Sequence, residues 1–518
     1  MTRQADVAVL GAGGMGAGIA EVAARAGHEV RLYDTRPEAV RHAVDRIGRN
    51  LARDVGRGRL EAGEAARTAA LVQPVTSMAD LAGAGVVVEA IVEDLAAKRD
   101  LLVEVEKVVT QNGADEVLLT TNTSSLSVTA LATALQRPGL LVGLHFFNPA
   151  PRMSLVEVVR GDATEPAVVE AAVELARAWG KTPVLCRSTP GFVVNRVARA
   201  FYGEAQRLVE CRAADPATLD AVLREAGGFP MGPFQLADLV GQEVNLAVTR
   251  SVWEQTFHDP RYAPTVFQQH LVDAGRLGRS TGRGVYAYSP EGEPVDAAPL
   301  TAPHRRAPGA VQLVDYDFGP MAPFLDRIER GGVTVERVTL TDSEALEELP
   351  GLRLPGEGLL RVTDGSTARS WSMEAPGGVV LLDWAHDPAT CRRVALMAPR
   401  DVEPAVLDAA IGLCQAAGVE VSVIADVAGG IVARTVSMLV NEAVDLVARG
   451  EASATDVDVA MLLGTGYPSG PLEWGDRVSA IRVASVLGEL HEETPTGRYR
   501  LSPRLDEAVV AEENLRDL

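Results

Sequence analysis

A histidine and a glutamate are the side chains in this sequence best suited to proton transfer. His145 ends an apolar segment that begins at residue 141, and Glu157 lies inside the apolar run 155–159. Because burying an unpaired carboxylate is costly, Glu157 needs a partner, and His145 could be that partner. Such a pair would orient the imidazole and make it a better general base. The alternative is a core histidine and an edge-strand glutamate without a chemical role.

Hydroxyl and amide groups occur at two further positions where predicted elements end or begin. The run 121–125, Thr-Asn-Thr-Ser-Ser, follows a predicted strand and includes Ser124. Asn195 follows the segment 189–192 at the start of a predicted helix, from which its amide could reach across a cleft between domains. Both residue types also commonly cap helices, so a purely structural role stays open for each.

A glycine-rich loop near the start of the chain has the spacing of a dinucleotide-binding turn. Its residues are Gly11, Ala12, Gly13, Gly14, Met15 and Gly16, and they follow a predicted strand directly and open a helix. The first glycine permits the tight turn, the second lets the backbone approach a pyrophosphate, and the third lets helix and strand pack closely. Asp34 ends the next predicted strand, where a carboxylate accepts hydrogen bonds from ribose hydroxyls and repels a 2′-phosphate. The sequence therefore predicts a dinucleotide site that favours NAD over NADP, a preference that Arg36 could soften.

Strand and helix patterns alternate through the first part of the chain, which predicts a parallel sheet wound with helices. We expect a helix over 19–26 and a long, charged helical stretch between Asp34 and Val72. The expected strands are 7–10, 30–33, 86–89, 118–121 and 141–144. Beyond about residue 188 the pattern turns helical, with helices expected over 195–210, over 216–225 and from residue 234.

An internal repeat organises the rest of the chain. When Arg196 is placed on Arg434, a shift of 238 residues, the two halves keep one register over a long span without a gap. The fold class predicted is an α/β Rossmann-type domain plus an all-α domain, followed by a reduced Rossmann-like domain and a second all-α domain. The expected boundaries are an NAD-binding domain at 1–187, a helical domain at 188–289, a Pro-rich linker at 290–310, a reduced Rossmann-like domain at 311–427 and a degenerate helical domain at 428–518.

Composition excludes several classes of protein. The 518 residues include 49 lysines and arginines against 70 aspartates and glutamates, so the formal net charge of −21 disfavours nucleic acid and anionic membranes as partners. The sequence has no apolar run of about 18 residues and no signal-peptide segment, which predicts a cytoplasmic protein. The cysteines, expected to be small buried hydrophobes in a reducing compartment, are Cys186, Cys211, Cys391 and Cys414.

Seven motifs, in order over residues 5 to about 288, resemble those of the 3-hydroxyacyl-CoA dehydrogenase family. They are the glycine loop continued to Ala20, 88–93, 121–126, 145–149, 189–196, 229–234 and 282–286. The resemblance implies that His145 is the catalytic base, that Glu157 orients it, and that Ser124 and Asn195 donate hydrogen bonds around the reacting oxygen of the substrate. No metal is expected. The implied NAD contacts are Asp34, Ala90, Glu93, Lys98, Ser124 and Asn148.

The same resemblance implies an acyl-CoA substrate. In the relatives, a helical excursion at the place of residues 34–72 contacts CoA, and this chain carries Arg49, Arg53 and Arg57 there. Local positive charge would suit a polyanionic ligand on an acidic protein, although a solvated helix face explains any one arginine equally well.

The second copy has lost the residues that catalysis needs. At the shift of 238 residues, His145 is aligned with Asp383, Glu157 with Ala395 and Asn195 with Ala433. The sequence between the linker and residue 380 contains no G-x-G-x-x-G loop. We expect the two helical domains to pair within the chain as a pseudo-dimer, which leaves further homo-oligomers possible. The two-copy arrangement resembles the enzymes of bacterial phenylacetate breakdown, which implies 3-hydroxyadipyl-CoA or 3-hydroxybutyryl-CoA as the substrate.

Two other hypotheses are compatible with parts of the sequence. A β-hydroxyacid dehydrogenase acting on a free acid also has a glycine loop and a helical domain, but its family uses a lysine base. A non-catalytic nucleotide-binding protein could reuse the same fold, although the set Ser124, His145, Glu157 and Asn195 argues against it.

Overall fold

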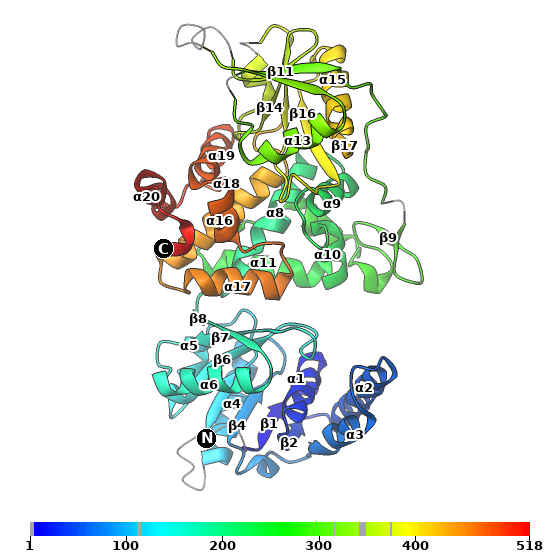
Figure 1. The fold of residues 1–518 in the computed structure, drawn as a ribbon. Coiled ribbons are helices and arrows are strands. Elements are labelled where there is room, and N and C mark those ends of the chain that lie inside the picture. Colours follow the sequence, from blue (N-terminus) through cyan, green and yellow to red (C-terminus); the bar gives the residue numbers. More distant parts are fainter. Residues whose placement is uncertain (1–4, 111–116, 296, 315, 341–348, 373–374) are drawn as a thin grey trace. The chain divides into compact units, whose positions relative to one another are not determined.

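The computed structural model describes residues 5–110, 117–295, 297–314, 316–340, 349–372 and 375–518 (Figure 1). These residues form two compact units. The first unit contains the chain up to Arg196 together with residues 449–465, and the second contains residues 197–448 and 466–518. Among the residues described, none of the helices combines the length and the apolar character that spanning a bilayer requires.

An eight-stranded sheet forms the centre of the first unit. Its strands are β1 (Val7–Leu10), β2 (Val30–Tyr33), β3 (Val72–Pro74), β4 (Val86–Glu89), β5 (Leu118–Thr121), β6 (Leu141–Phe146), β7 (Leu155–Arg160) and β8 (Thr182–Arg187). Their order is β3-β2-β1-β4-β5-β6-β7-β8, and every pair is parallel except β6 with β7. Strands such as β1 and β4 are apolar almost throughout because helices cover both faces of the sheet. The strand order reverses at β1, where such sheets bind ligands beyond the carboxyl ends of the strands.

The first unit contains several helices, two of which, α2 (Pro37–Gly56) and α3 (Ala62–Leu71), form the long charged stretch predicted after Asp34. Those from the first part of the chain are α1 (Gly14–Arg25), α2, α3, α4 (Leu95–Thr110), α5 (Val128–Ala132) and α6 (Pro166–Ala178), and α7 (Val194–Val197) begins here. In Figure 1 the dark blue α1, α2 and α3 lie beside β1 and β2. The five predicted strands are confirmed, with β6 running two residues further than expected. The first helix begins at Gly14 rather than Ile19 because the glycine loop itself forms its N-terminus.

One helix of the first unit comes from far along the sequence. α17 (Ala454–Thr465) packs against β7 and β8. Just before it, Ala452 forms an isolated antiparallel bridge with Cys186 at the end of β8. The sheet that carries the glycine loop is thus covered in part by a segment of the second half of the chain.

The second unit begins with the expected helices. They are α8 (Arg199–Glu210), α9 (Pro216–Glu225), α10 (Pro233–Val240), α11 (Gln242–Gln255) and α12 (Val266–Asp273). The predicted helix 195–210 is divided into α7 and α8. A two-stranded hairpin of β9 (Ala287–Tyr288) and β10 (Pro294–Val295) was not predicted, and β10 lies in the expected linker.

A seven-stranded mixed sheet follows in the second unit. Its strands are β11 (Ala310–Val314), β12 (Thr334–Val338), β13 (Gly351–Leu354), β14 (Gly358–Val362), β15 (Val379–Leu382), β16 (Arg393–Ala398) and β17 (Glu420–Ala425). Their order is β12-β11-β13-β14-β15-β16-β17, and the helices in this region are α13 (Ala322–Arg330), α14 (Ala368–Ser372) and α15 (Pro404–Ala416).

The last helices of the second unit surround a buried central one. α16 (Val432–Ala448) contacts α18 (Pro471–Val478), α19 (Ala480–Glu493) and α20 (Pro503–Ala511), and it also contacts α8. Every residue of α16 from Val432 to Leu446 is buried. A helix that is buried all round lies in the middle of its domain.

The predicted repeat is confirmed element by element. Under the shift of 238, α15, β16, β17, α18 and α19 fall on α6, β7, β8, α10 and α11 with identical bounds. The antiparallel pair β15–β16 likewise repeats β6–β7.

Of the four cysteines, Cys186, Cys391 and Cys414 are buried as expected, whereas Cys211 is exposed, so the expectation was wrong for that residue. Cys211 lies directly after the last residue of α8, where a helix end meets solvent.

Candidate functional site

The glycine loop folds as its spacing predicts. Gly11 adopts φ +102°, and a Cβ there would lie 2.5 Å from the carbonyl oxygen of Ala90. A Cβ on Gly16 would lie 1.8 Å from the carbonyl oxygen of Gly11, so α1 can approach β1 only because residue 16 lacks a side chain. Gly13 and Gly14 have no atoms within 4 Å of a built Cβ. The first and last glycines therefore serve packing, and the open side of the loop at the helix N-terminus suits a pyrophosphate.

Asp34 ties the end of β2 to this loop. The backbone N–H of Ala12 donates to Oδ2 of Asp34 (2.9 Å), and the N–H of Arg36 donates to Oδ1 (3.0 Å). Partial burial raises the pKa of Asp34, but these hydrogen bonds and the charge of Arg36 outweigh burial and hold its pKa below the ordinary value. The carboxylate is thus ionised at neutral pH at the strand end where the sequence predicts a ribose contact.

Arg46 on α2 is a loop contact that the sequence analysis did not single out for this site. Its Nη2 donates to the carbonyl oxygens of Gly13 (2.8 Å) and Ala12 (3.2 Å). The guanidinium therefore holds the carbonyls of the loop on the side of α2. The only available signal was an arginine in the charged stretch, which cannot by itself distinguish Arg46 from its neighbours.

The predicted proton-transfer pair is in contact. In the antiparallel register of β6 and β7, His145 lies directly opposite Glu157, and Nδ1 of His145 is hydrogen-bonded to Oε2 of Glu157 at 2.6 Å. The glutamate is fully buried and the histidine is 6% exposed. The rings of Phe147 and Phe192 lie 4.6 and 5.9 Å from the imidazole, centre to centre. A histidine held at Nδ1 by a carboxylate keeps Nε2 for a second partner.

Glu157 also has a second task. Its Oε1 accepts hydrogen bonds from the backbone N–H groups of Val193 (3.1 Å) and Val194 (2.9 Å), at the start of α7. The same carboxylate therefore orients the histidine and caps the helix that carries Asn195.

Ser124 lies in a turn wrapped around Glu93. Oε1 of Glu93 accepts hydrogen bonds from the N–H of Ser124 (2.8 Å), its hydroxyl (3.2 Å) and the hydroxyl of Thr123 (2.6 Å). The amide of Asn195 donates to the carbonyl oxygen of Ser124 (3.3 Å), so these two predicted residues are brought together. Burial raises the pKa of Glu93, but the charge of Lys98 and the hydrogen bonds from the turn outweigh it and lower the pKa overall.

The other predicted cofactor contacts lie around the same strand ends. Lys98, 1% exposed, donates to Glu89 (2.7 Å) and lies 3.3 Å from Glu93, so its ammonium is held within the protein. Ala90 follows β4 and donates its N–H to the carbonyl of Leu10 (2.8 Å). Asn148 follows β6 and is exposed. Glu89 accepts hydrogen bonds from Lys98 and from the hydroxyl of Thr121, so the buried charges of Lys98 and Glu89 are paired with each other.

The arginines expected to meet the substrate share one face of a helix. Arg49 and Arg53 lie on α2 and Arg57 directly follows it, each four residues from the next and each exposed. The buried positions Ile47 and Leu51 lie on other faces of the helix. Within the part of the chain that the structure describes, no three His, Cys, Asp or Glu side chains gather closely enough to hold a metal ion.

The second copy holds different chemistry at the equivalent positions. Asp383 is fully buried, and its Oδ2 accepts hydrogen bonds from the N–H groups of Ile431 (2.8 Å) and Val432 (2.7 Å). His386 is bonded to the hydroxyl of Ser469 (3.0 Å), and burial lowers its pKa to about 4. Asp383 thus caps a helix N-terminus, and His386 is held by a serine hydroxyl.

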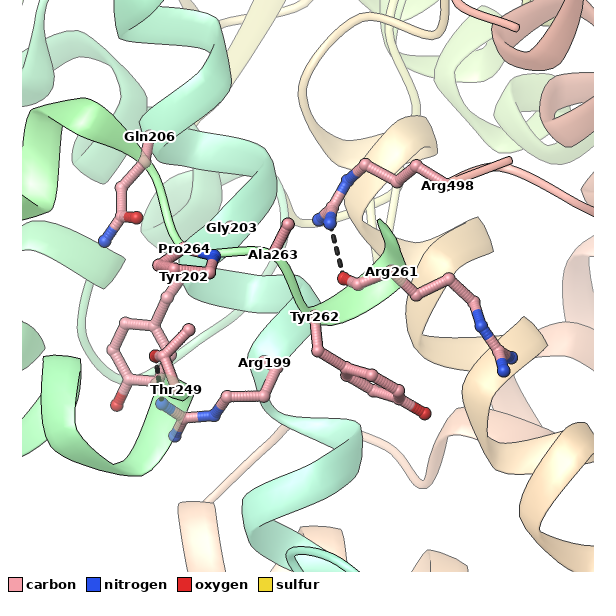
Figure 2. A pocket seen from close by; sticks show the side chains of 10 residues that line it. All are labelled: Arg199, Tyr202, Gly203, Gln206, Thr249, Arg261, Tyr262, Ala263, Pro264 and Arg498. Atoms are coloured by element: carbon pink, nitrogen blue, oxygen red, sulfur yellow. Dashed lines mark hydrogen bonds between the residues drawn. The ribbon is translucent and has the colours of Figure 1, made fainter. Parts of the chain in front are cut away.

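A separate pocket lies in the second unit (Figure 2). It is lined by Arg199, Tyr202, Gly203, Gln206, Thr249, Arg261, Tyr262, Ala263, Pro264 and Arg498. Figure 2 shows Arg498 donating to the carbonyl of Arg261 and Arg199 contacting Thr249. Arg261 also pairs with Asp259 (2.8 Å). None of the predicted catalytic residues lines this pocket, whose arginines are bound to protein groups.

The chain matches three family models. Residues 6–189 match the 3-hydroxyacyl-CoA dehydrogenase NAD binding domain, and residues 191–288 and 429–517 match the C-terminal domain of that family. Residues 360–427 match the reduced Rossmann-fold domain of 3-hydroxybutyryl-CoA dehydrogenase.

Individual relatives agree with these models. The chain is 42% identical over 495 residues to a 3-hydroxyadipyl-CoA dehydrogenase of Escherichia coli K12, covering 95% of each protein. It is 38% identical over 283 residues to a 3-hydroxybutyryl-CoA dehydrogenase of Mycobacterium tuberculosis, covering 54% of this chain and 98% of that protein. A crystal structure of a 3-hydroxybutyryl-CoA dehydrogenase from Escherichia coli K12 matches with a TM-score of 0.84 at 40% identity, over 98% of this chain and 99% of that one.

Proposed function

The chain belongs to the 3-hydroxyacyl-CoA dehydrogenase family, and we propose that His145, oriented by Glu157, is the general base of its reaction. The protein is an oxidoreductase that uses NAD to oxidise a 3-hydroxyacyl-CoA to the 3-oxoacyl-CoA. Family membership sets aside the two alternatives from the sequence, a dehydrogenase of free hydroxy acids and a non-catalytic nucleotide-binding protein.

The observation that carries this role is the 2.6 Å contact between Nδ1 of His145 and Oε2 of Glu157. A carboxylate at Nδ1 fixes the tautomer that leaves Nε2 to accept a proton, and it stabilises the imidazolium that forms. Removing the 3-hydroxyl proton as hydride leaves C3 gives the ketone without a high-energy alkoxide. In the reverse direction, protonated His145 returns the proton to the 3-oxo group.

Ser124 and Asn195 are the proposed hydrogen-bond donors to the reacting oxygen. Their support is that the amide of Asn195 already contacts the backbone of Ser124, and that Glu93 holds the Ser124 turn through several donors at once. The backbone of the Ser124 turn is thus fixed before substrate binds, which lowers the reorganisation needed in the transition state. The single hydroxyl proton of Ser124, which donates to Glu93 in this structure, must turn to the substrate oxygen.

The residues around the glycine loop fit the cofactor. We propose that the loop 11–16 holds the pyrophosphate and Asp34 the adenosine ribose, with further contacts from Ala90, Glu93 and Asn148. The open space at Gly13 and the ionised carboxylate of Asp34 support this. Lys98, predicted as a contact from the sequence, is buried and would act through its ion pair with Glu93. Bound NAD supplies the hydride acceptor.

Arg49, Arg53 and Arg57 are proposed to attract the phosphates of CoA. Their support is an exposed row of positive charge on α2 in a protein whose formal net charge is −21. Such a row raises the local concentration of a polyanion and weakens with added salt.

The substrate is proposed to be 3-hydroxyadipyl-CoA or 3-hydroxybutyryl-CoA. The full-length relatives carry both names, so they do not choose between the two. The test is NADH oxidation with 3-oxoadipyl-CoA and acetoacetyl-CoA in parallel. Turnover of at least one is expected, and a tenfold or greater preference in kcat/KM identifies the acyl class. No turnover of either, with NADH still bound, would contradict the proposal.

We also propose that the two helical regions pair within one chain as a pseudo-dimer. Glu204 on α8 is fully buried and accepts hydrogen bonds from Arg498 (2.8 Å) and Tyr499 (3.0 Å) of the second copy. Arg261 likewise pairs with Asp445 (3.1 Å) on α16. Losing one partner of a buried ion pair costs about 3–5 kcal/mol. A Glu204→Gln variant as stable as wild type would contradict this pairing.

A reciprocal exchange gives further support. Within the second unit, α9 of the first copy packs on β16 of the second, where Glu225 pairs with Arg393 (2.9 Å). Within the first unit, α17 of the second copy packs on β7 and β8 of the first. Each copy thus covers the sheet of the other with the equivalent helix.

We place the reaction in the cytoplasm, as the sequence predicts and in keeping with cysteines that form no disulfide.

A further inference from the structure

A carboxylate from the catalytically silent second copy lies against the segment that carries Asn195. Glu451, 9% exposed, comes between α16 and α17 and belongs to the first unit. Its Oε2 forms an ion pair with Nη1 of Arg196 and accepts a hydrogen bond from the hydroxyl of Thr189 (3.0 Å). Its carbonyl oxygen accepts a hydrogen bond from the N–H of Arg187 (2.8 Å). Glu451 therefore holds both ends of the segment 189–196.

That segment touches every proposed catalytic group. The ring of Phe192 lies edge-on to His145 at 5.9 Å. The next two residues donate their N–H groups to Glu157, and Asn195 donates to the carbonyl oxygen of Ser124. A shift of the segment would move the neighbour of the histidine, the donors to its partner and the proposed substrate amide together.

The equivalent contact in the second unit lacks the carboxylate. At the shift of 238, Arg187 corresponds to Ala425 and Glu451 to Ala213, and the N–H of Ala425 donates to the carbonyl of Ala213 (3.0 Å). The backbone contact is thus repeated, but an alanine stands where the first unit has Glu451. Ala433, which replaces Asn195, follows this second contact. The carboxylate is present at the contact that serves the catalytic copy and missing at the contact that serves the silent one.

We propose that Glu451 is a positioning residue for the first active site, supplied within the chain by the second copy. This inference rests on the proposed roles of His145, Glu157 and Asn195. The carboxylate does not touch substrate or cofactor; it fixes the segment 189–196 through Arg196 and Thr189. Because a displacement of about 1 Å in a catalytic group costs on the order of 100-fold in rate, loss of one anchor should appear in kcat.

The test compares Glu451→Ala and Glu451→Gln with Asp456→Asn in the full-length enzyme. Asp456 lies in the first turn of α17, where its side chain accepts a hydrogen bond from the hydroxyl of Ser453 rather than from Thr189 or Arg196. The Asp456 variant therefore controls for a general weakening of this docked helix. Values of kcat are expressed per NADH-binding site, counted by fluorescence titration, so that loss of folded protein does not lower them.

We expect kcat with a 3-oxoacyl-CoA to fall about 10–100-fold in Glu451→Ala, with the KM for NADH within about twofold of wild type. Asp456→Asn should keep the wild-type kcat. If the alanine variant does not fold, Glu451→Gln, which keeps the size and one acceptor oxygen, decides on the same readout with a smaller expected loss. A kcat within twofold of wild type in the Glu451 variants, or an equal loss in Asp456→Asn, would overturn the inference alone. A wild-type enzyme that turns over no 3-oxoacyl-CoA would overturn the proposed function with it.

Discussion

Glu157 and Asp383 cap equivalent helix N-termini from different strands. Oε1 of Glu157, on β7, accepts the N–H groups of residues 193–194 at the start of α7. Oδ2 of Asp383, which follows β15, accepts those of residues 431–432, their equivalents at the shift of 238. Asp383 stands where the first copy has its histidine, so the second copy has replaced a histidine–glutamate pair by one carboxylate that keeps only the capping role.

This relationship predicts different outcomes for two matched variants. In Glu157→Gln one oxygen becomes an NH₂ group, which must face either the histidine or the N–H groups of α7. Both stability and kcat should fall, with a kcat loss on the order of 10²-fold or more. In Asp383→Asn the same conflict arises without a histidine, so stability should fall by about 1–3 kcal/mol with kcat unchanged. Thermal unfolding and NADH oxidation measure both effects.

The outcome that contradicts this account is a large loss of kcat in Asp383→Asn at normal folding. A Glu157→Gln enzyme with wild-type kcat would contradict the proposed role of Glu157 in orienting His145.

The carboxylate of Asp34 should set the cofactor preference. Asp34→Ser removes the proposed ribose acceptor and the acceptor for Ala12, and leaves Arg36 next to the site. Hydrogen bonds to charged groups are worth about 1.5–3 kcal/mol, which corresponds to roughly 10–100-fold. We expect the ratio of kcat/KM for NADH to that for NADPH to fall by this factor. Asp45→Ser, which changes an exposed aspartate of α2, is the control; an unchanged ratio in Asp34→Ser would argue against the ribose contact.

Local sequence patterns predicted the helices and strands of the sheet domain, but they did not predict contacts between residues far apart in the sequence. The apolar strands β1, β4 and β5 and the glycine loop were predictable because each depends on neighbouring residues in the sequence. The contact of His145 with Glu157 could be expected because a buried carboxylate needs a partner. The placement of α17 on β7 and β8 could not, since a helical pattern does not state which sheet it will cover. The roles of Arg46 and Glu451 depend on the same kind of distant pairing.

His386 should make the second unit sensitive to acid. Burial lowers its pKa to about 4, so the folded protein holds it neutral while the unfolded chain takes up a proton near the ordinary value of 6.5. Its stabilising contribution is therefore complete above about pH 6.5 and lost as the pH falls toward 4. Because the ring is partly accessible, the effect is on the order of 1–3 kcal/mol.

The difference between wild type and His386→Gln isolates this contribution. We expect wild type to lose more of its thermal midpoint than the variant between pH 6.5 and 4.5. His304→Gln, an exposed histidine, should behave like wild type. Parallel curves for wild type and His386→Gln would show that His386 is not buried in its neutral form.

The measurement that tests the central claim most directly is NADH oxidation by His145→Gln with whichever 3-oxoacyl-CoA the wild type turns over. NADH affinity is measured on the same samples by fluorescence, and His386→Gln serves as a histidine control in the other unit. If His145 is the general acid and base, kcat falls on the order of 10²–10⁴-fold while NADH binding stays within about threefold of wild type. A variant that binds NADH normally and keeps a kcat within tenfold of wild type would show that another group moves the proton.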